Sequence, residues 1–530
     1  MSSIVSQLVY QMNSLLSRLR CGAILRNSLG VCAVLALSSP AFAVDYVWST
    51  GTWVPGTSPS PLLAGDVLQI NTGGFKYFDA TTFTNQSGTV NWNADAIYMR
   101  NGAIVNNQSL WDSKADTTLV YNGGALPTFN NSGTFLKSAG GTATVGVNFS
   151  NSGLVQSTTG LLSFSNGITG TTGTITTTGA TGAVTLGTAS TTGTLSIGGS
   201  AAASLTLGAN TLTVSTDYNN VNFGTGNFFN RRATVSTSGV GNRIIAAGDA
   251  NQGVTGAGVA NGNSTTPTLT IGNVHVGANT VNYSIANTGT TGPALRGAIQ
   301  TNVNGASLTD GRLTGSGVTA GNWGAVATGT GLSQDVTFTV ASAGVYSPLT
   351  LQVVNILNNF DNTRSQLLAI TSAGGAAAYN LAAGGVTPNP ITLANQRVGD
   401  VNSTVLTVSN TAPAGAFTEG LNASFGTLTG SAQTNSGSVN LIAGSASNNS
   451  AMSVSLNTAT AGHRTGTAVV NLTSDGTGTS SLGLTALTPQ TVAISGDVYR
   501  LATANAATPN PVVLASQRVG GSATQALSLT

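Results

Sequence analysis

Short runs in which apolar and polar residues alternate recur along most of the chain. Val184-Thr-Leu186, Leu195-Ser-Ile197 and Leu205-Thr-Leu207 are three examples, and each run is closed by a glycine. A two-residue period is typical of a half-buried β-strand, and glycine favours the tight turn that follows it. The pattern therefore predicts an all-β protein.

A longer phrase repeats in the first half of the chain, beginning at Phe83, Ile104, Phe129 and Phe149. Each copy has an apolar residue, an asparagine-containing turn, a glycine and a second strand, except that the copy at Ile104 is degenerate and lacks the glycine. The step of about 20 residues suits one coil of a β-solenoid. We therefore expect a β-solenoid (parallel β-helix) over residues 44–215. A disordered Gly/Thr linker is the competing interpretation of residues 170–200, but regularly spaced aliphatic residues argue against it.

The two ends of the expected solenoid have a different composition. Tryptophans and prolines are concentrated in residues 44–65, which we interpret as an N-terminal cap that shields the first strands. Residues 216–265 interrupt the strand pattern with clustered aromatics and the pair Arg231-Arg232. This stretch is predicted to be a cap or linker.

The second half of the chain repeats at the scale of a whole domain. Thr387–Gly399 reads TPNPITLANQRVG, Thr508–Gly520 reads TPNPVVLASQRVG, and Thr266–Gly277 is a fainter copy. Several short strands in about 120 residues are typical of an Ig-like β-sandwich. We expect one sandwich over 266–386, a second over 387–507 and the start of a third, truncated copy over 508–530.

Particular phrases make this half resemble the choice-of-anchor D domain. They are the strands ending at Asn287 and Asn410, the extended strand before each Ala-Gly pair, and residues 472–476. That family consists of Ig-like modules in bacterial surface and secreted proteins, and the N-terminal half resembles the solenoid passenger regions of bacterial adhesins and autotransporters. The resemblance implies a surface protein and carries no site residue.

The N-terminus has the parts of a secretory signal peptide. Arg18, Arg20 and Arg26 precede the apolar run 29–37, and Ala41-Phe42-Ala43 supplies a small-x-small cleavage site. The run is too short to span a bilayer. We therefore predict a signal peptide over 1–43, with Ala41 and Ala43 as the cleavage residues. The mature chain is then exported to the cell surface or outside of a bacterium, with the outer membrane as one destination.

The low share of charged residues limits the classes of molecule that the protein is expected to bind. Only 6% of the residues are charged, and removing the leader leaves 14 basic residues against 15 acidic ones. Such a surface does not attract nucleic acid or anionic lipid. No later stretch is long and apolar enough for a membrane span. An unknown surface ligand, such as a glycan or a host or cell-surface component, remains the expected partner.

Side chains suited to catalysis or metal binding are scarce. Glu419 is the only glutamate, and aspartates such as Asp95 and Asp116 are scattered singly, whereas glycoside hydrolysis usually needs two positioned carboxylates. His275 and His463 occupy different positions of different repeats, and both cysteines, Cys21 and Cys32, lie in the leader. We therefore predict no catalytic, cofactor-binding or metal-binding residue, no cofactor, and no enzyme activity.

These observations predict an exported structural or adhesin-like protein whose Ig-like domains act as spacers. Two alternatives stay open. One is a solenoid module that binds or degrades polysaccharide, with the Asp95–Asp116 region as its site. The other is an ice-binding face built on threonines such as Thr174 and Thr176. The glycine-rich run 253–258 lacks the lysine of a phosphate-binding loop and is attributed to composition.

Overall fold

The computed structural model describes residues 43–198, 204–220, 235–238, 243–303, 306–308, 310–350 and 352–529. The predicted signal peptide, Ala41 included, lies outside these residues, and of the predicted cleavage residues only Ala43 is described. Strands and turns make up the described residues, together with one 3-10 turn at Ser316–Val318. The all-β prediction is confirmed. Within the described ranges, no helix has the length and apolar character needed to cross a membrane.

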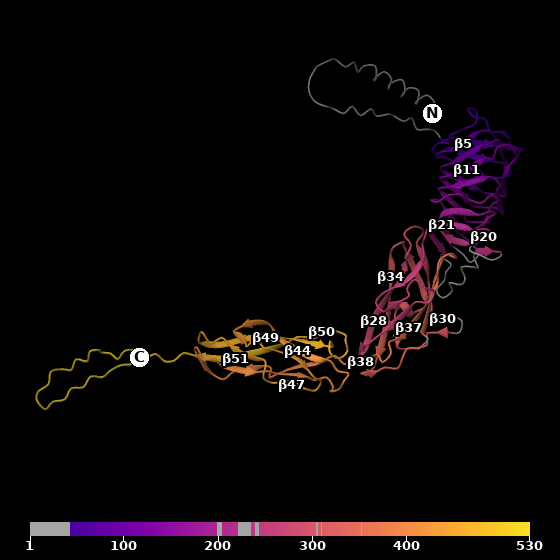
Figure 1. Ribbon diagram of the computed structural model, residues 1–530. Helices are drawn as coiled ribbons and strands as arrows, with labels where there is room; N and C mark the ends of the chain where they lie inside the picture. The colour runs from indigo at the N-terminus through magenta and orange to yellow at the C-terminus, as the bar shows by residue number, and fades with distance from the viewer. Residues whose placement is uncertain are drawn as a thin grey trace, which may run out of the picture. The chain divides into compact units, whose positions relative to one another are not determined.

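The described residues between Asp45 and Ala246 form a β-solenoid of stacked parallel strands (Figure 1). Its first sheet has ten strands: β1 (Asp45–Trp48), β3 (Val67–Ile70), β6 (Thr89–Trp92), β9 (Leu110–Ser113), β12 (Thr134–Lys137), β15 (Leu154–Ser157), β17 (Thr174–Thr177), β19 (Ser190–Ile197), β21 (Leu212–Asn220) and β23 (Ile244–Ala246). Its second sheet has nine: β2 (Gly51–Thr52), β4 (Lys76–Asp79), β7 (Ala96–Arg100), β10 (Thr117–Tyr121), β13 (Thr142–Val145), β16 (Leu161–Phe164), β18 (Ala183–Leu186), β20 (Ser204–Gly208) and β22 (Val235–Thr237).

A third sheet of four strands closes the early coils: β5 (Thr82–Asn85), β8 (Ile104–Asn107), β11 (Thr128–Asn131) and β14 (Asn148–Asn151). Each strand of this sheet ends in a buried asparagine. The amide Nδ2 of the first three donates to the Oδ1 of the asparagine one coil further on, at 2.9 Å from Asn85 to Asn107, 2.7 Å from Asn107 to Asn131 and 2.8 Å from Asn131 to Asn151. Such a ladder pairs polar groups that would otherwise be costly to bury.

The solenoid interior changes along its length. Aromatic rings fill the early coils, where Trp111 contacts Phe129 at 5.0 Å between ring centroids and Phe149 contacts Phe164 at 4.9 Å. Aliphatic residues such as Ile175 and Leu195 fill the later coils. The column of the third sheet continues after β14. Thr169 forms a bridge with Ser150, the Thr191 N–H donates to the Ile168 carbonyl, and the first residues of the long strands β19 and β21 pair with each other.

The register revises three details of the sequence interpretation. Val105, not Ile104, lies beside Phe83 and Phe129 in the third sheet, and Ile104 points outward. The steps of 11 and 10 residues between Val184, Leu195 and Leu205 are half-coils, because these residues alternate between the two long sheets. The early residues 44–65 contribute β1 and β2, which begin the two long sheets.

The first β-sandwich begins shortly after the solenoid ends. One sheet contains β24 (Gln252–Thr255), β28 (Gly277–Asn287), β34 (Gly331–Val340) and β32 (Leu313–Thr314). The other contains β25 (Val259–Ala260), β26 (Thr268–Ile271), β37 (Gln366–Ser372), β36 (Gln352–Asn358), β29 (Leu295–Gln300) and β33 (Gly321–Val326). Smaller sheets are formed by β27 (Val274–His275), β38 (Ala377–Tyr379) and β35 (Gly344–Val345), and by β30 (Asn302–Val303) with β31 (Ala306–Ser307).

The second sandwich repeats this plan around its own core. Its largest sheet contains β40 (Ile391–Thr392), β41 (Gln396–Arg397), β51 (Gln490–Tyr499), β49 (Gly462–Asp475), β50 (Leu484–Ala486), β44 (Gly420–Gly430) and β46 (Ser438–Ile442). Two three-stranded sheets complete it: β39 (Gly384–Thr387), β43 (Thr407–Asn410) and β47 (Ser447–Asn448), and β42 (Ser403–Val405), β48 (Ser453–Leu456) and β45 (Ala432–Thr434).

Strand pairing supports the alignment of the two copies. His275 pairs with Tyr379 and Arg397 pairs with Tyr499, in parallel ladders one repeat apart. The buried Asn287 and Asn410 each end a strand, and each side chain bonds the backbone of the following turns. The sandwiches nevertheless begin earlier than predicted, with β24 and β39. Residues 216–265 are therefore not a separate cap or linker: their described part is shared between the last coils and the first sandwich.

The C-terminal residues 508–529, predicted to begin a third copy, form no strand in the structure. One antiparallel bridge joins Thr508 to Ser528, through reciprocal backbone hydrogen bonds. Most side chains of this segment are exposed. Even two strands formed from this segment could not enclose a sandwich core by themselves.

Candidate functional site

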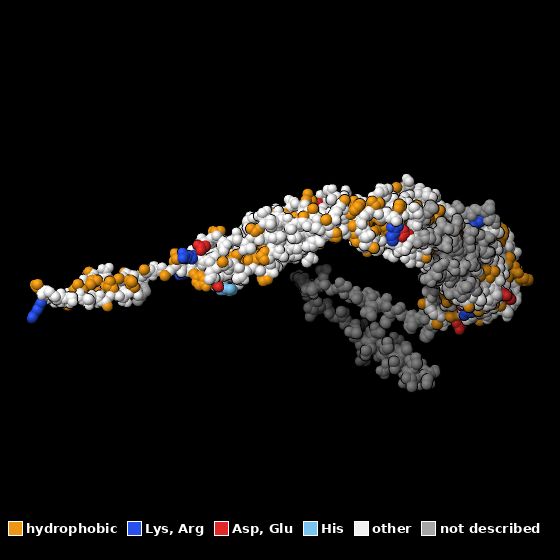
Figure 2. All heavy atoms as spheres, turned by 90° about the horizontal axis from the view of Figure 1, so that it is seen from below, with side chains coloured by type: hydrophobic (Ala, Val, Ile, Leu, Met, Phe, Trp, Pro, Cys, Tyr) orange, Lys and Arg blue, Asp and Glu red, His pale blue; other side chains and the backbone are white. Residues whose placement is uncertain are grey.

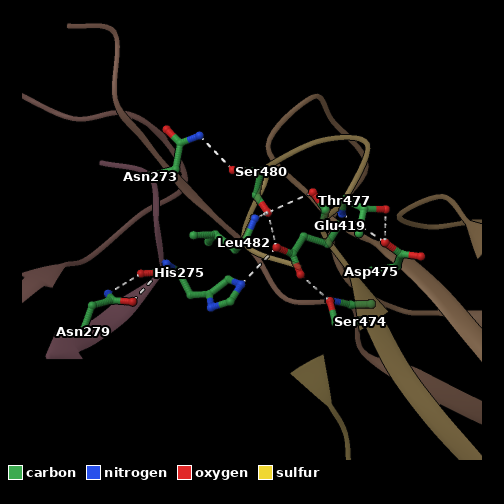
Figure 3. Close-up of polar contacts among 11 residues, drawn as sticks. Asn273, His275, Asn279, Glu419, Ser474, Asp475, Thr477, Ser480 and Leu482 are labelled. Atoms are coloured by element: carbon green, nitrogen blue, oxygen red, sulfur yellow. Dashed lines mark hydrogen bonds and ion pairs between the residues drawn. The ribbon is translucent and has the colours of Figure 1, made fainter. Parts of the chain in front are cut away.

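A cluster of hydrogen-bonded polar side chains surrounds Glu419, which lies just before β44 (Figure 3). The carboxylate is fully buried. Its Oε1 lies 2.9 Å from Nε2 of His275, and its Oε2 accepts a hydrogen bond from Ser474 Oγ at 2.7 Å. Ser480 Oγ also donates to Oε1. Burying a carboxylate is tolerable only when its charge is met in this way.

His275 reaches this cluster from β27 of the first sandwich. Its backbone N–H donates to Asn279 Oδ1 at 3.0 Å, and Asn279 Nδ2 donates back to the His275 carbonyl at 2.7 Å. A second bridge runs from Asn273 Nδ2 to the carbonyl of Ser480, at 2.8 Å. Residues of two consecutive sandwiches therefore share one hydrogen-bonded network.

Aromatic and backbone contacts extend this junction. The rings of Tyr379 and Phe417 lie 5.6 Å apart. The backbone N–H of Asn380 donates to the Phe417 carbonyl, and that of Glu419 donates to the Asn380 carbonyl. The segment that leaves the first sandwich is thus bonded directly to the loop that carries Glu419.

The arrangement differs from a nucleophilic triad. A triad needs a serine hydroxyl bonded to the histidine, so that the imidazole can take its proton. Here Ser474 and Ser480 both donate to the carboxylate, and Ser474 Oγ also accepts from the N–H of Ala382. The network is suited to holding two modules together.

Other candidate residues from the sequence lie in separate, locally paired positions. Asp95 is 3.2 Å from the buried Lys76 Nζ, and Asp116 accepts from the N–H groups of Gly141 and Thr142 at 2.6 and 2.8 Å. Both aspartates thus brace neighbouring coils. Among the residues that the structure describes, no group of three or more His, Cys, Asp or Glu side chains is placed to hold a metal ion.

His463 forms a second histidine–carboxylate pair far from the first. Its Nδ1 lies 2.8 Å from Asp497 Oδ1, and the two side chains are 64% and 46% exposed. His463 and Ser474 stand near opposite ends of β49, which at about 3.3 Å per residue separates the two pairs by about 35 Å. The histidines therefore share no site.

The remaining predicted motifs have structural explanations. Residues 253–255 of the glycine-rich run lie in β24, which pairs with β28 instead of leading into a helix. Thr174 and Thr176 lie beside Leu154 and Gln156 of the preceding coil, and Thr176 is buried, so the threonine columns do not continue across that coil. Arg231-Arg232 lies outside the described residues.

The solenoid and the first sandwich meet through a comparable set of contacts. Arg296 binds Asp217 through two hydrogen bonds of 2.9 Å. Asn359 Nδ2 donates to the Tyr218 carbonyl at 2.7 Å, and the Tyr218 ring lies 5.9 Å from that of Phe360. Asp361 Oδ2 accepts from the N–H of Ile244 at 2.9 Å. The apolar core continues from the solenoid into this sandwich.

The two junctions use equivalent ends of the two sandwiches. Asn287 Nδ2 donates to the carbonyl of Pro293, as Asn410 Nδ2 does to that of Glu419, so Pro293 stands in the first copy where Glu419 stands in the second. The loop after β36 contacts the solenoid and the loop after β49 contacts the first sandwich. Glu419 is the only glutamate of the chain, and no other feature of the sequence pointed to the second junction.

Comparisons with known proteins add little to this description. No family model matches the chain, and no curated protein matches it. Among solved structures, PapD-like domain 7 of human CEP192 aligns at 8% identity over 23% of this chain and 89% of its own, with a TM-score of 0.18. The CupB6 tip adhesin from Pseudomonas aeruginosa aligns at 10% identity over 48% of this chain and 100% of its own, with a TM-score of 0.15. An endo-fucoidan hydrolase of glycoside hydrolase family 107 aligns at 10% identity over 51% of this chain and 32% of its own, also with a TM-score of 0.15. These likenesses are too weak to support a conclusion about function.

Proposed function

We propose that the chain is an exported bacterial surface protein without enzymatic activity, in which the two Ig-like sandwiches are spacers for an adhesive solenoid. The observation that carries the proposal is the repeated end-to-end junction. Each sandwich uses the same end to bind the module before it, through buried polar groups and aromatic contacts. Joining modules in series is what a spacer requires.

Three further features support the proposal. The N-terminal pattern is that of a secretory leader, and the mature part of the sequence contains no cysteine. Charged side chains are few on the face shown in Figure 2, and most blue ones lie beside red ones, which suits contact with an uncharged ligand. The Asn and Gly phrases of the sandwiches resemble choice-of-anchor D domains, which are surface modules.

Treatment of intact cells with a protease that does not enter them tests the proposal. We expect the chain to be degraded under conditions in which a cytoplasmic marker protein survives. Protection of the chain until the cells are lysed would contradict it. Antibodies against each sandwich would identify the fragments and report which module is cleaved first.

A further inference from the structure

Three aromatic rings gather on the outer face of the nine-stranded sheet, in its first coils. Tyr77 of β4 pairs with Tyr98 of β7, and their ring centroids lie 5.4 Å apart. Phe75, which precedes β4, lies 5.5 Å from the Tyr98 ring and is 65% exposed. A cluster of exposed rings on a solvent-facing sheet indicates a contact surface, since such rings gain free energy when they leave water.

A hollow of about 200 Å³ lies against these rings. It is lined by Gly73, Gly74, Phe75, Asp95, Ala96 and Tyr98. A Cβ on Gly73 would lie 2.2 Å from the Ser49 carbonyl oxygen, and one on Gly74 would lie 2.4 Å from Thr50 Oγ1. The Gly73 position is therefore restricted to glycine, because a Cβ there would clash with the backbone of the neighbouring coil, whereas at Gly74 it would meet only the side chain of Thr50. The volume of the hollow admits one hexose ring.

The charges around the rings cancel one another. Asp95 pairs with Lys76, and Asp79 pairs with Arg100 at 2.7 Å. The Arg100 guanidinium also lies 4.8 Å from the centre of the Tyr77 ring, an attractive cation–π distance. A charged ligand would thus gain little from this face, whereas the carboxylates still have lone pairs that hydroxyl groups can reach.

A straight row of hydroxyls continues from the rings along the same face. Thr118, Thr144, Ser163 and Thr185 lie side by side on consecutive strands, next to Ala96. Each is partly exposed, and none of the four hydroxyls is hydrogen-bonded to another described residue. Neighbouring strands are about 4.8 Å apart, which is close to the advance of one sugar unit in an extended chain.

We propose that this face binds an extended, uncharged polysaccharide. One sugar ring would lie on Phe75, with its weakly positive C–H face against the negative face of the aromatic ring. Tyr98, whose plane is inclined by 66° to that of Phe75, would contact the edge of the same sugar. The following units would run along the hydroxyl row, exchanging hydrogen bonds with Thr118 and Thr144. Aromatic surface with a few placed polar groups is the usual composition of a small-molecule site. The inference rests on the proposed surface function, for which it names the ligand class.

Affinity electrophoresis of the purified full chain tests the inference. Gels would contain hydroxyethyl cellulose or glucomannan as uncharged probes, and polygalacturonate as the charged comparison. We expect retardation by an uncharged probe only. Phe75→Ala and Tyr98→Ala should each weaken binding about 10-fold, as the loss of a central aromatic contact does in other interfaces.

Leu126→Ala is the matched control, because Leu126 is also exposed on the solenoid, at 57%, but lies outside the hollow. It should bind like the unchanged chain, and thermal unfolding of every variant would show that the fold is kept. Absence of retardation by both uncharged probes, equal retardation by polygalacturonate, or unchanged binding of the Phe75→Ala variant would overturn the inference. None of these outcomes bears on whether the chain reaches the cell surface, so the two proposals fail separately.

Discussion

The imidazole of His275 in the first sandwich lies 2.9 Å from the buried carboxylate of Glu419 in the second. The two residues are 144 positions apart in the chain. A carboxylate that is closed off from water needs donors on both oxygens, and here one of them comes from the preceding domain. The contact therefore couples the stability of the second sandwich to its neighbour.

Replacing His275 by alanine should destabilise the chain, because Glu419 would keep its burial and lose a charge-assisted partner. We expect a loss of about 1–3 kcal/mol in the free energy of unfolding, measured by urea denaturation. His463→Ala is the matched control, since its pair with Asp497 is exposed and should contribute less than about 1 kcal/mol. Equal losses of unfolding free energy in the two variants would show that the buried pair stabilises the chain no more than the exposed pair does.

The asparagine ladder gives a prediction within the solenoid. Asn131→Ala would leave Asn107 Nδ2 and Asn151 Oδ1 without their ladder partners, and we expect a cost of about 1–3 kcal/mol in unfolding free energy. Asn130→Ala, at the adjacent outward-facing position of β11, should change it by about 0.5 kcal/mol or less. A ladder substitution as mild as the outward one would contradict the role assigned to the ladder.

Asp249 predicts how acid affects the joint between the solenoid and the first sandwich. Hydrogen bonds from the backbone and hydroxyl groups of Thr291 and Thr290 lower the pKa of this carboxyl to about 2. Because the unfolded value is about 3.9, its contribution to stability is complete above about pH 4 and is lost as the pH falls through 2. The difference in denaturation midpoint between the unchanged chain and Asp249→Asn should therefore shrink over that range. A difference that stays constant would contradict the assignment.

Lys137 predicts a change in stability of the same sign, but at alkaline pH. Its side chain is buried, its Nζ donates to the carbonyl of Ala115 at 2.8 Å, and burial lowers its pKa. The unfolded chain then binds a proton more readily than the folded one, so this residue's contribution to stability rises with pH up to the ordinary lysine pKa of about 10.4. Relative to Lys137→Met, the unchanged chain should gain stability as the pH rises toward that value. A parallel dependence in both proteins would exclude Lys137 as the source.

Local patterns in the sequence were sufficient to predict the solenoid and the repeated sandwiches. Alternation and the spacing of glycine and asparagine report strands and turns directly, and the copies align through His275 and Arg397. The coil register was harder to predict, because Ile104 and Val105 are adjacent and both apolar, and only stacking shows that Val105 faces inward.

Contacts between distant segments could not be predicted in the same way. Nothing near His275 in the sequence indicates Glu419, and their pairing depends on how one folded sandwich meets the next. The aromatic face has the same origin: Phe75 and Tyr98 are 23 residues apart and become neighbours through the parallel register of β4 and β7. Stacking of coils creates both the hollow and the hydroxyl row.

Cysteine labelling of intact cells tests the central claim most directly, because both natural cysteines lie in the predicted leader. Val401 is 94% exposed and Val470 is fully buried, both in the second sandwich. If the chain is a folded surface protein, a membrane-impermeant maleimide will label Val401→Cys on intact cells, and will label Val470→Cys only after denaturation. Labelling of Val401→Cys that appears only after lysis would contradict the account.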